Sequence, residues 1–286
     1  MSQIVDTSNL TDLQFSNART LAENCNTHDS LDYLHMIKAM ADIGHHFQLY
    51  DQDVLVGLLT FPFDGNVHTS NPEALLVVDP AHRRKGIGSQ LVGRAKDYWH
   101  SLGVNSYLLA CEDKSASGNA FLKAVGGEFS HSELRLRLEN KLRQLTESTV
   151  SLRLAKLEDL DLLVRLLAKA FDDPIEAHIP RLLRDLPSTH HRFYLGSVNQ
   201  NPIGCIGVVG EERRAYVIAF GIIPEHRGRG YGRQMLSQTA NSLLTENWHD
   251  IFIEVDSTNQ VALSLYETCG FNKYTSYNYY KIKCDG

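Results

Sequence analysis

Three features are scarce in this 286-residue chain, and each scarcity excludes a class of protein. Uncharged apolar runs stay short of the roughly 18 residues that a membrane-spanning helix needs, and the first residues lack the basic and apolar regions of a signal peptide. The five cysteines are scattered without any Cys-x-x-Cys, which argues against a disulfide framework or a zinc site and indicates a reducing compartment. The net charge is −6, whereas nucleic-acid-binding surfaces are normally basic. We therefore expect a cytoplasmic protein that binds neither membranes nor nucleic acids.

The remaining composition, 43% hydrophobic and 22% charged, is that of a globular protein rather than a disordered or collagen-like chain. Its length suits one large domain or two of about 140 residues. An internal repeat favours two domains. The segment Val78–Leu91 returns as Ile222–Met235 at a constant offset of 144 residues, with six identities in fourteen positions. The offset is half the length, so the sequence predicts a duplication, with domains at 1–143 and 149–286.

Each copy is expected to alternate strands and helices. In the second copy the apolar spacing predicts the order β-α-α-β-β-β-α-β-α-β, which is an α/β fold with a mixed sheet. The first copy repeats this order, with a weaker opening strand at Gln3–Val5 and a longer turn at Phe63–Asn71. The second copy is predicted to have strands at Ser151–Leu154, Arg192–Leu195, Ile203–Val209, Tyr216–Ile223, Ile251–Val255 and Tyr277–Ile282 and helices at Leu160–Phe171, Ile179–Leu186, Gly232–Leu244 and Ala262–Cys269.

The repeated segment has the pattern strand, Arg-x-x-Gly-x-Gly, helix in both copies. Free backbone N–H groups at a helix N-terminus bind phosphate oxygens, and glycine lets a phosphate approach the backbone closely. A dinucleotide fold needs a third glycine where Leu91 and Met235 stand, and a P-loop needs Gly-Lys-Ser/Thr, which neither copy has. The duplicated motif therefore favours a phosphate site of another kind. Cations surround it, namely Arg83, Arg84 and Lys85 in the first copy and Arg227, Arg229 and Arg233 in the second.

The second copy carries further motifs that make a family resemblance specific. Arg227-x-x-Gly230-x-Gly232 after a strand is followed by Asn259 and by the run from Ala262 to Phe271. This combination resembles the GNAT superfamily of acetyl-CoA-dependent N-acetyltransferases, and the two copies resemble its tandem members, such as the mycothiol synthases. The resemblance implies two tandem domains, each a mixed, mostly antiparallel twisted sheet flanked by helices.

The resemblance also implies where acetyl-CoA binds. The backbone of the glycine loop would hold the pyrophosphate of CoA, and the pantetheine arm would run between two splayed strands. The implied residues of the second copy are Ile222, Ile223, Arg227, Gly228, Arg229, Gly230, Tyr231, Gly232, Arg233 and Asn259. Those of the first copy are Val77, Val78, Arg83, Arg84, Lys85, Gly86, Ile87, Gly88 and Ser89.

Two residues of the second copy are candidates for proton transfer. Asn259, Leu263 and Tyr266 share one helix face by spacing, and the resemblance assigns Tyr266 the protonation of the departing thiolate. The alternative is that Tyr266 is only a core aromatic. Glu254 interrupts an apolar strand and lies on the face opposite Ile253. It is placed to deprotonate the amine through a water, as the similar Glu of ribosomal-protein alanine acetyltransferases does, or it is a solvated or salt-bridged strand residue.

The first copy lacks both candidates. Subtracting 144 from Glu254, Asn259 and Tyr266 leads to Ala110, Ser115 and Leu122. We expect the first half to bind CoA without turnover or to use its pocket structurally.

The leading hypothesis is a GNAT-type N-acetyltransferase that moves an acetyl group from acetyl-CoA to a primary amine of a small molecule by direct attack in a ternary complex. A peptide or protein N-terminus is an alternative acceptor, and a non-catalytic acyl-CoA-binding regulatory protein is an alternative function. A third option is a nucleotide-binding protein that uses the loops for ATP. Release of CoA in the presence of an amine panel separates these hypotheses.

Overall fold

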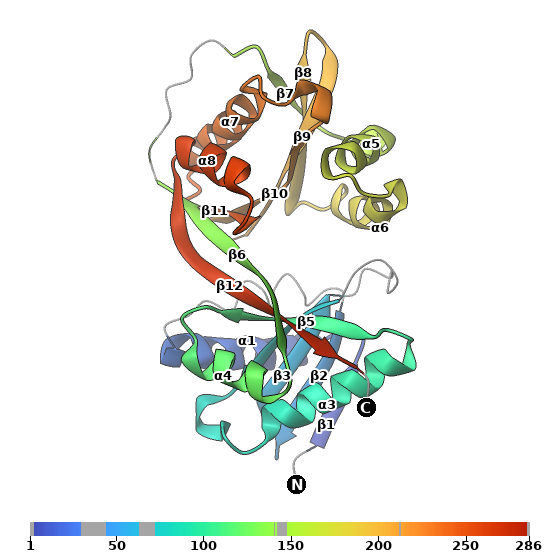
Figure 1. Ribbon diagram of the computed structural model, residues 1–286, viewed down its shortest axis with the longest axis vertical. Helices are drawn as coiled ribbons and strands as arrows, with labels where there is room; N and C mark the ends of the chain where they lie inside the picture. The colour runs from blue at the N-terminus through green and yellow to red at the C-terminus, as the bar shows by residue number, and fades with distance from the viewer. Residues whose placement is uncertain are drawn as a thin grey trace. The chain divides into compact units, whose positions relative to one another are not determined.

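The computed structural model describes residues 3–29, 44–62, 72–139, 141, 148–211 and 213–284 (Figure 1). The chain forms two compact units. Unit 1 comprises residues up to Ser132 together with those from Tyr277 onward, and unit 2 runs from Glu133 to Ser276. Each unit is α/β, as the sequence predicted. The turn predicted at 63–71 lies outside the described residues.

Unit 1 is built on a sheet in the strand order β1-β2-β3-β4-β5-β12, in which β4 and β5 run parallel and the other described neighbours run antiparallel. Leu58 and Leu59 are neighbours in β3 and face opposite sides, one toward α1 and the other toward α3. The sheet therefore has a helix on each face. Its elements are β1 (Gln3–Thr7), α1 (Asp12–Asp29), β2 (Gly44–Asp51), β3 (Val54–Pro62), β4 (Glu73–Val78), α3 (Ile87–Ser101), β5 (Ser106–Glu112), α4 (Ala116–Ala124) and β6 (Glu128–Leu138).

Unit 2 repeats this plan in the order β6-β11-β10-β9-β8-β7, with β10 and β11 parallel. One cluster of buried side chains joins α5 and α6 to the sheet, and a second joins α7 and α8 to the other face. Its elements are β7 (Ser151–Leu154), α5 (Leu160–Phe171), α6 (Ile175–Asp185), β8 (His191–Val198), β9 (Asn201–Glu211), β10 (Arg214–Ile222), α7 (Tyr231–Thr245), β11 (Asp250–Asp256), α8 (Gln260–Thr268) and β12 (Phe271–Lys283).

The last strand of each half contributes to the unit built from the other half. β6 ends the first half, yet its residues Glu133–Arg137 pair with β11 of unit 2. β12 ends the second half, yet its residues Tyr277–Lys283 pair with β5 of unit 1. The compact units therefore differ from the predicted domains 1–143 and 149–286. The alternating leucines of β6 identify a strand with one buried face, but alternation does not reveal which sheet the strand joins.

The predicted elements of the second half all occur, with shifted ends. α6 begins at Ile175 rather than Ile179 and contains Pro180, a residue that usually ends or kinks a helix. β12 begins at Phe271 rather than Tyr277. Gly270 follows α8 with a φ of +90°, a left-handed conformation that commonly ends a helix. The five cysteines are all buried and form no disulfide.

Candidate active site

The glycine loops of the two units have the same backbone shape. Gly230 precedes α7 with a φ of +75°, and Gly86 precedes α3 with a φ of +81°. Gly228 also has a positive φ, and in unit 1 Arg84 takes this conformation at the equivalent position. Neither helix start has a side-chain cap, and Gly86 and Gly230 are both exposed. Uncapped N–H groups at a helix N-terminus can bind an anion.

The first arginine of each motif anchors its loop through hydrogen bonds to the backbone. Arg227 donates from Nε to the carbonyl of Ile222 at 2.9 Å and from Nη2 to the carbonyl of Ala170. Arg83 donates from Nε to Val78 at 3.0 Å and holds both carboxylate oxygens of Asp29, at 2.8 and 2.7 Å. Arg83 is thus paired with a carboxylate, whereas Arg227 bonds to neutral carbonyls and keeps its positive charge beside the loop. That these two guanidinium groups add cations to a phosphate site stays a prediction.

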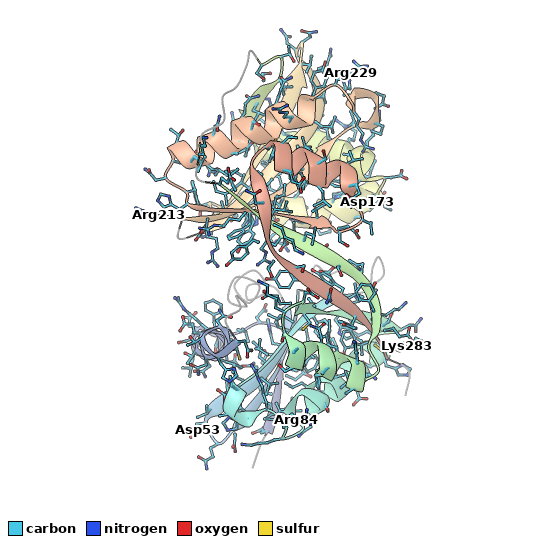
Figure 2. The ribbon with its side chains drawn as sticks, turned by 60° about the vertical axis from the view of Figure 1, so that its left-hand side comes forward. Asp53, Arg84, Asp173, Arg213, Arg229 and Lys283 are labelled. Carbon is cyan, nitrogen blue, oxygen red and sulfur yellow. The ribbon has the colours of Figure 1, made fainter. Side chains whose placement is uncertain are left out.

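Burial of Asp29 works to raise the pKa of its carboxyl, but the hydrogen bonds from Arg83 and His28 outweigh it and hold this pKa below its ordinary value. The remaining predicted cations lie in the loops, except Arg233, which lies in the first turn of α7. Figure 2 shows Arg84 and Arg229 at the surface of their units, and Lys85 and Arg233 are exposed as well.

The sheet of unit 2 is split beside its loop. β10 and β11 pair in parallel only as far as Val217 and Ile253 among the described residues. On the other side of β10, the ladder to β9 shifts between Ile218 and Gly221, and Ala219 has a φ of +48°. The two residues inside the shift have no register partner on β9. A bulge of this kind releases backbone N–H groups from the ladder, and such donors can stabilise negative charge on an acyl oxygen.

Unit 1 has the split without the bulge. β4 and β5 pair only as far as Leu75 and Ala110. β3 and β4 keep a regular register from Gly57 opposite Val78 to Thr60 opposite Leu75. Leu75 stands at the position of Ala219 and remains in the ladder. The predicted lining residues Val77 and Val78 therefore lie on a continuous strand edge. Sequence reasoning missed the bulge, because register is not visible in a single strand's pattern.

Asn259 has the same helix-capping role as its counterpart in unit 1, Ser115. Its side-chain oxygen accepts a hydrogen bond from the N–H of Ala262 at 3.1 Å and caps α8. Ser115 caps α4 in the same way, accepting from Gly118 at 3.3 Å. Ser and Asn are both favoured at this position, so their exchange preserves the helix start. Asn259 was predicted to bind the cofactor, and in this structure its carboxamide is engaged by its own helix.

Tyr266 lies next to the bulge. Its ring is 6.2 Å from that of Phe220, one of the two residues inside the register shift, and 6.4 Å from that of Phe271. It shares a buried helix face with Leu263, as predicted. Burial raises the pKa of the phenol to about 12, so Tyr266 is a neutral hydrogen-bond donor at physiological pH. Leu122 occupies the equivalent, equally buried position in unit 1.

Glu254 projects from the opposite face of β11. Its neighbours Ile253 and Val255 are buried in the cluster that contains Tyr266, whereas Glu254 is 41% exposed. Its Oε1 accepts hydrogen bonds from Arg135, at 2.7 Å from Nε. Of the two roles considered for Glu254, the salt bridge is thus present, and its partner was missed. Arg135 comes from the first half, and the exchange of strands that brings it here has no signature in sequence.

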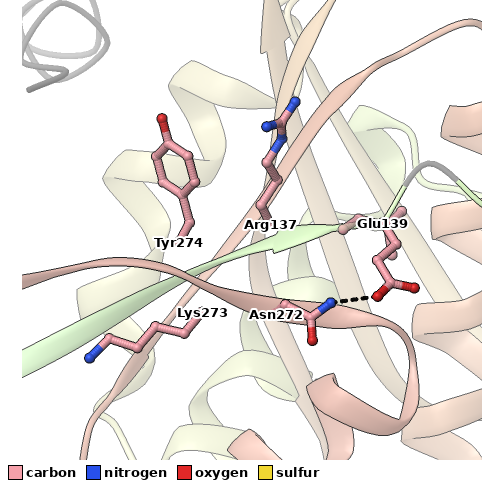
Figure 3. Close-up of a pocket in the computed structure, with 6 residues that line it drawn as sticks. Arg137, Glu139, Asn272, Lys273 and Tyr274 are labelled. Atoms are coloured by element: carbon pink, nitrogen blue, oxygen red, sulfur yellow. Dashed lines mark hydrogen bonds between the residues drawn. The ribbon is translucent and has the colours of Figure 1, made fainter. Parts of the chain in front are cut away.

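Two surface depressions of unit 2 are lined by other residues. One, of about 380 Å³, is lined by Arg137, Leu138, Glu139, Asn272, Lys273 and Tyr274. Figure 3 shows that Asn272 donates to Glu139, at 2.8 Å, at one end of this depression, while Tyr274 and Arg137 project together from neighbouring strands. The second is lined by Thr189, His190, Arg192, Val208, Gly210, Glu246 and Trp248. None of the predicted site residues lines either one.

No group of three or more His, Cys, Asp or Glu side chains suited to a metal ion occurs among the described residues. No helix in the described part of the chain has both the length and the apolar character to span a membrane.

A model of the acetyltransferase (GNAT) family matches residues 10–126 and 160–271, one region in each half of the chain. The chain belongs to the GNAT acetyltransferase family. The family resemblance is thereby confirmed over both copies, and the chain is an acetyltransferase of tandem architecture.

Mycothiol acetyltransferase of Thermobispora bispora is 27% identical over 252 residues, which cover 79% of this chain and 80% of that protein. Spermidine N(1)-acetyltransferase of Vibrio cholerae is 29% identical over 110 residues, which cover 35% of this chain and 62% of that protein. A solved tandem GNAT protein from the clavulanic acid biosynthesis pathway has a TM-score of 0.77 at 15% identity and covers 100% of this chain and 99% of its own. The last comparison confirms the fold over both units.

Proposed function

We propose that unit 2 transfers an acetyl group from acetyl-CoA to a primary amine of a small molecule, by direct attack in a ternary complex. The observation that carries the proposal is the position of Tyr266 beside the bulge of β10, where the sheet splits. Unit 1 has the same loop and a similar split, but it has Leu122 instead of the phenol and a regular strand instead of the bulge. In this proposal, the groups needed for acyl transfer are gathered in unit 2.

The residues present in unit 2 fit acetyl-CoA, which supplies an activated acetyl group as a thioester when bound. The exposed turn at Gly228 and Gly230, followed by an uncapped helix start, suits the pyrophosphate. The free edge of β10, with Ile222 and Ile223, suits the amide-bearing pantetheine arm. Released N–H groups at the bulge would stabilise negative charge on the acetyl oxygen.

In this proposal, Glu254 and Tyr266 act from opposite faces of the sheet of unit 2, beside the split. Glu254 accepts the proton of the attacking amine through a water on its exposed face. Tyr266 gives the departing sulfur a hydrogen bond on the other face. A thiol resembling free cysteine has a pKa of about 8.5. Since the pKa of Tyr266 is about 12, a hydrogen bond to the thiolate is favoured over complete proton transfer.

The glycine loop of unit 1 retains the shape needed to bind CoA phosphates, through the predicted residues Arg84 to Ser89. We propose that it binds CoA without turnover, because Ala110, Leu122 and Leu75 replace the carboxylate, the phenol and the bulge residue. The acceptor class is a small amine. The spermidine acetyltransferase relative acts on such a molecule by its name, and unit 2 has the exposed Glu254 to receive an amine.

The test is an assay of the full chain with acetyl-CoA and three acceptors, namely spermidine, an aminoglycoside and a peptide with an N-terminal alanine. We expect CoA release that depends on an amine and equals the acetylated product in amount. Turnover of the peptide alone would transfer the proposal to N-terminal acetylation. Acetyl-CoA binding without turnover of any amine would contradict the proposal and favour a regulatory acyl-CoA-binding protein.

A further inference from the structure

The carboxylate proposed to accept the amine proton is held by a residue from the other half of the chain. Arg135 lies on β6, and its side chain is only 3% exposed. Its Nε and Nη2 both donate to Oε1 of Glu254, at 2.7 and 2.5 Å. Hydrogen bonds between charged groups are shorter and stronger than neutral ones, so this contact fixes the position of the carboxylate.

The geometry of the pair leaves one oxygen of Glu254 available. Both donors of Arg135 use Oε1, and Oε2 has no partner among the described residues. The Glu254 side chain is 41% exposed, so water can reach it. A carboxylate held through one oxygen presents the other in a defined direction, which is what a base that works through a bound water requires.

The backbone and a neighbouring ring place Arg135 itself. Arg135 and Glu254 are directly opposite each other in the antiparallel ladder of β6 and β11, so their side chains share a face. The guanidinium carbon of Arg135 lies 5.5 Å from the centre of the Tyr216 ring, within the range of a cation–π contact. Register and packing together restrict the long arginine side chain.

Unit 1 has the same strand arrangement without the charges. By the offset of 144, Glu254 corresponds to Ala110 and Arg135 to Tyr279, and these two residues are opposite each other in the ladder of β5 and β12. They are buried in an apolar cluster with Leu108 and Tyr277. The acid–arginine pair therefore occurs only in the unit that has Tyr266.

We infer that Arg135 is a positioning residue for the acetyl transfer in unit 2, which acts by holding Glu254 through Oε1 so that Oε2 receives the proton of the attacking amine. This inference rests on the proposed function. In the reaction, the amine nitrogen bonds to the acetyl carbon and the carbon–sulfur bond breaks. The proton lost by nitrogen passes through a water to Oε2, and the thiolate leaves with the electron pair of the broken bond.

The chain offers a matched control on the same two strands. Arg137 lies two residues from Arg135 on the same face of β6, and it bonds to Asp250 of β11 at 2.5 Å. The side chains of this pair are 43% and 36% exposed. Arg137→Met removes an arginine–carboxylate pair from the same ladder without touching Glu254.

The experiment compares steady-state kinetics of the natural full chain and five variants, with the best acceptor of the amine panel. The variants are Arg135→Met, Arg135→Lys, Glu254→Gln, the double variant Arg135→Met with Glu254→Gln, and Arg137→Met. Circular dichroism and thermal unfolding establish that each is folded. We expect Arg135→Met to lower kcat by about 10- to 100-fold, the range caused by a misplaced catalytic group, with the KM for acetyl-CoA changed less than about twofold. Arg135→Lys, which keeps the charge, should recover most of the loss, and Arg137→Met should stay within about twofold.

In the Glu254→Gln background, Arg135→Met should lower kcat by no more than about twofold. Arg135 acts only through the Glu254 carboxylate, and Glu254→Gln has already removed that carboxylate. A kcat of Arg135→Met near that of the natural chain, while Glu254→Gln is impaired, would overturn this inference alone. It would also be overturned if the kcat losses of the two single variants were equal and combined in full in the double variant. Full activity of Glu254→Gln, or a natural chain inactive with every amine, would overturn the proposed role of Glu254 and the inference with it. Should Arg135→Met fail to fold, a folded Arg135→Lys with kcat reduced to the level of Glu254→Gln would equally contradict it.

Discussion

At the scale of single residues, the two units differ at a few positions of otherwise equivalent frameworks. Tyr266 and Leu122 both fill a buried site on the helix that follows the split, and both therefore contribute to their cores. Only the tyrosine adds a hydrogen-bond donor, its phenolic hydroxyl, at that site. Burial disfavours the charged phenolate, which is why the pKa of Tyr266 rises to about 12. The catalytic and core roles considered from the sequence are thus compatible.

This pKa predicts the alkaline behaviour of the enzyme. A donor is active while protonated, so a raised pKa extends activity to higher pH. With a small amine acceptor, kcat should rise as the amine loses its proton and should not decline between about pH 10 and pH 11, because Tyr266 stays protonated there. The measurement is kcat at saturating substrates between about pH 7 and pH 11, with circular dichroism at each pH. A decline centred near pH 10 in a folded protein would indicate an ordinary tyrosine pKa and contradict the assignment.

At the scale of elements, sequence periodicity predicted most strands and helices, but it did not predict which strands pair with each other. Leu134, Leu136 and Leu138 alternate with polar residues and mark β6 as a strand, but the same pattern suits either sheet. The glycine loop was predictable because its positive φ angles demand particular residues. The bulge at Ala219 was not, since a register shift there places a non-glycine residue at positive φ. Glu254 was found from its break in apolar alternation, whereas Arg135 required the pairing of β6 with β11.

The strand exchange predicts which fragment of the chain folds. A chain of residues 149–286 lacks β6 and loses Leu136 and Leu138, which are 1% and 2% exposed, from its core. Two fully buried leucines contribute about 3–6 kcal/mol, a large share of the 5–15 kcal/mol of a typical domain. We expect this fragment to be insoluble or to lack a cooperative unfolding transition. The matched fragment 133–276 contains all of unit 2 and should unfold cooperatively. Equal thermal stability of the two fragments would contradict the role given to β6.

At the scale of the whole molecule, the chain is a duplication whose two units have kept one framework and diverged in their chemistry. Both keep the glycine loop, the anchoring arginine and the split between parallel strands. Unit 2 alone adds the bulge, the buried phenol and the carboxylate with its arginine. Each unit is completed by a strand from the other half, so the first half supplies Arg135, which binds Glu254 of the second. We therefore propose, as the central claim, that acetyl transfer takes place in unit 2.

The most direct test of that claim is the kcat of Tyr266→Phe in the full chain, with acetyl-CoA affinity measured by calorimetry on the same protein. Phenylalanine retains the buried ring beside Phe220 and removes only the phenolic hydroxyl. We expect kcat to fall by about 10²-fold or more, the usual effect of losing one positioned donor, with acetyl-CoA affinity within about threefold. A Tyr266→Phe protein that is folded, binds acetyl-CoA and keeps kcat within about threefold of the natural chain would contradict the account.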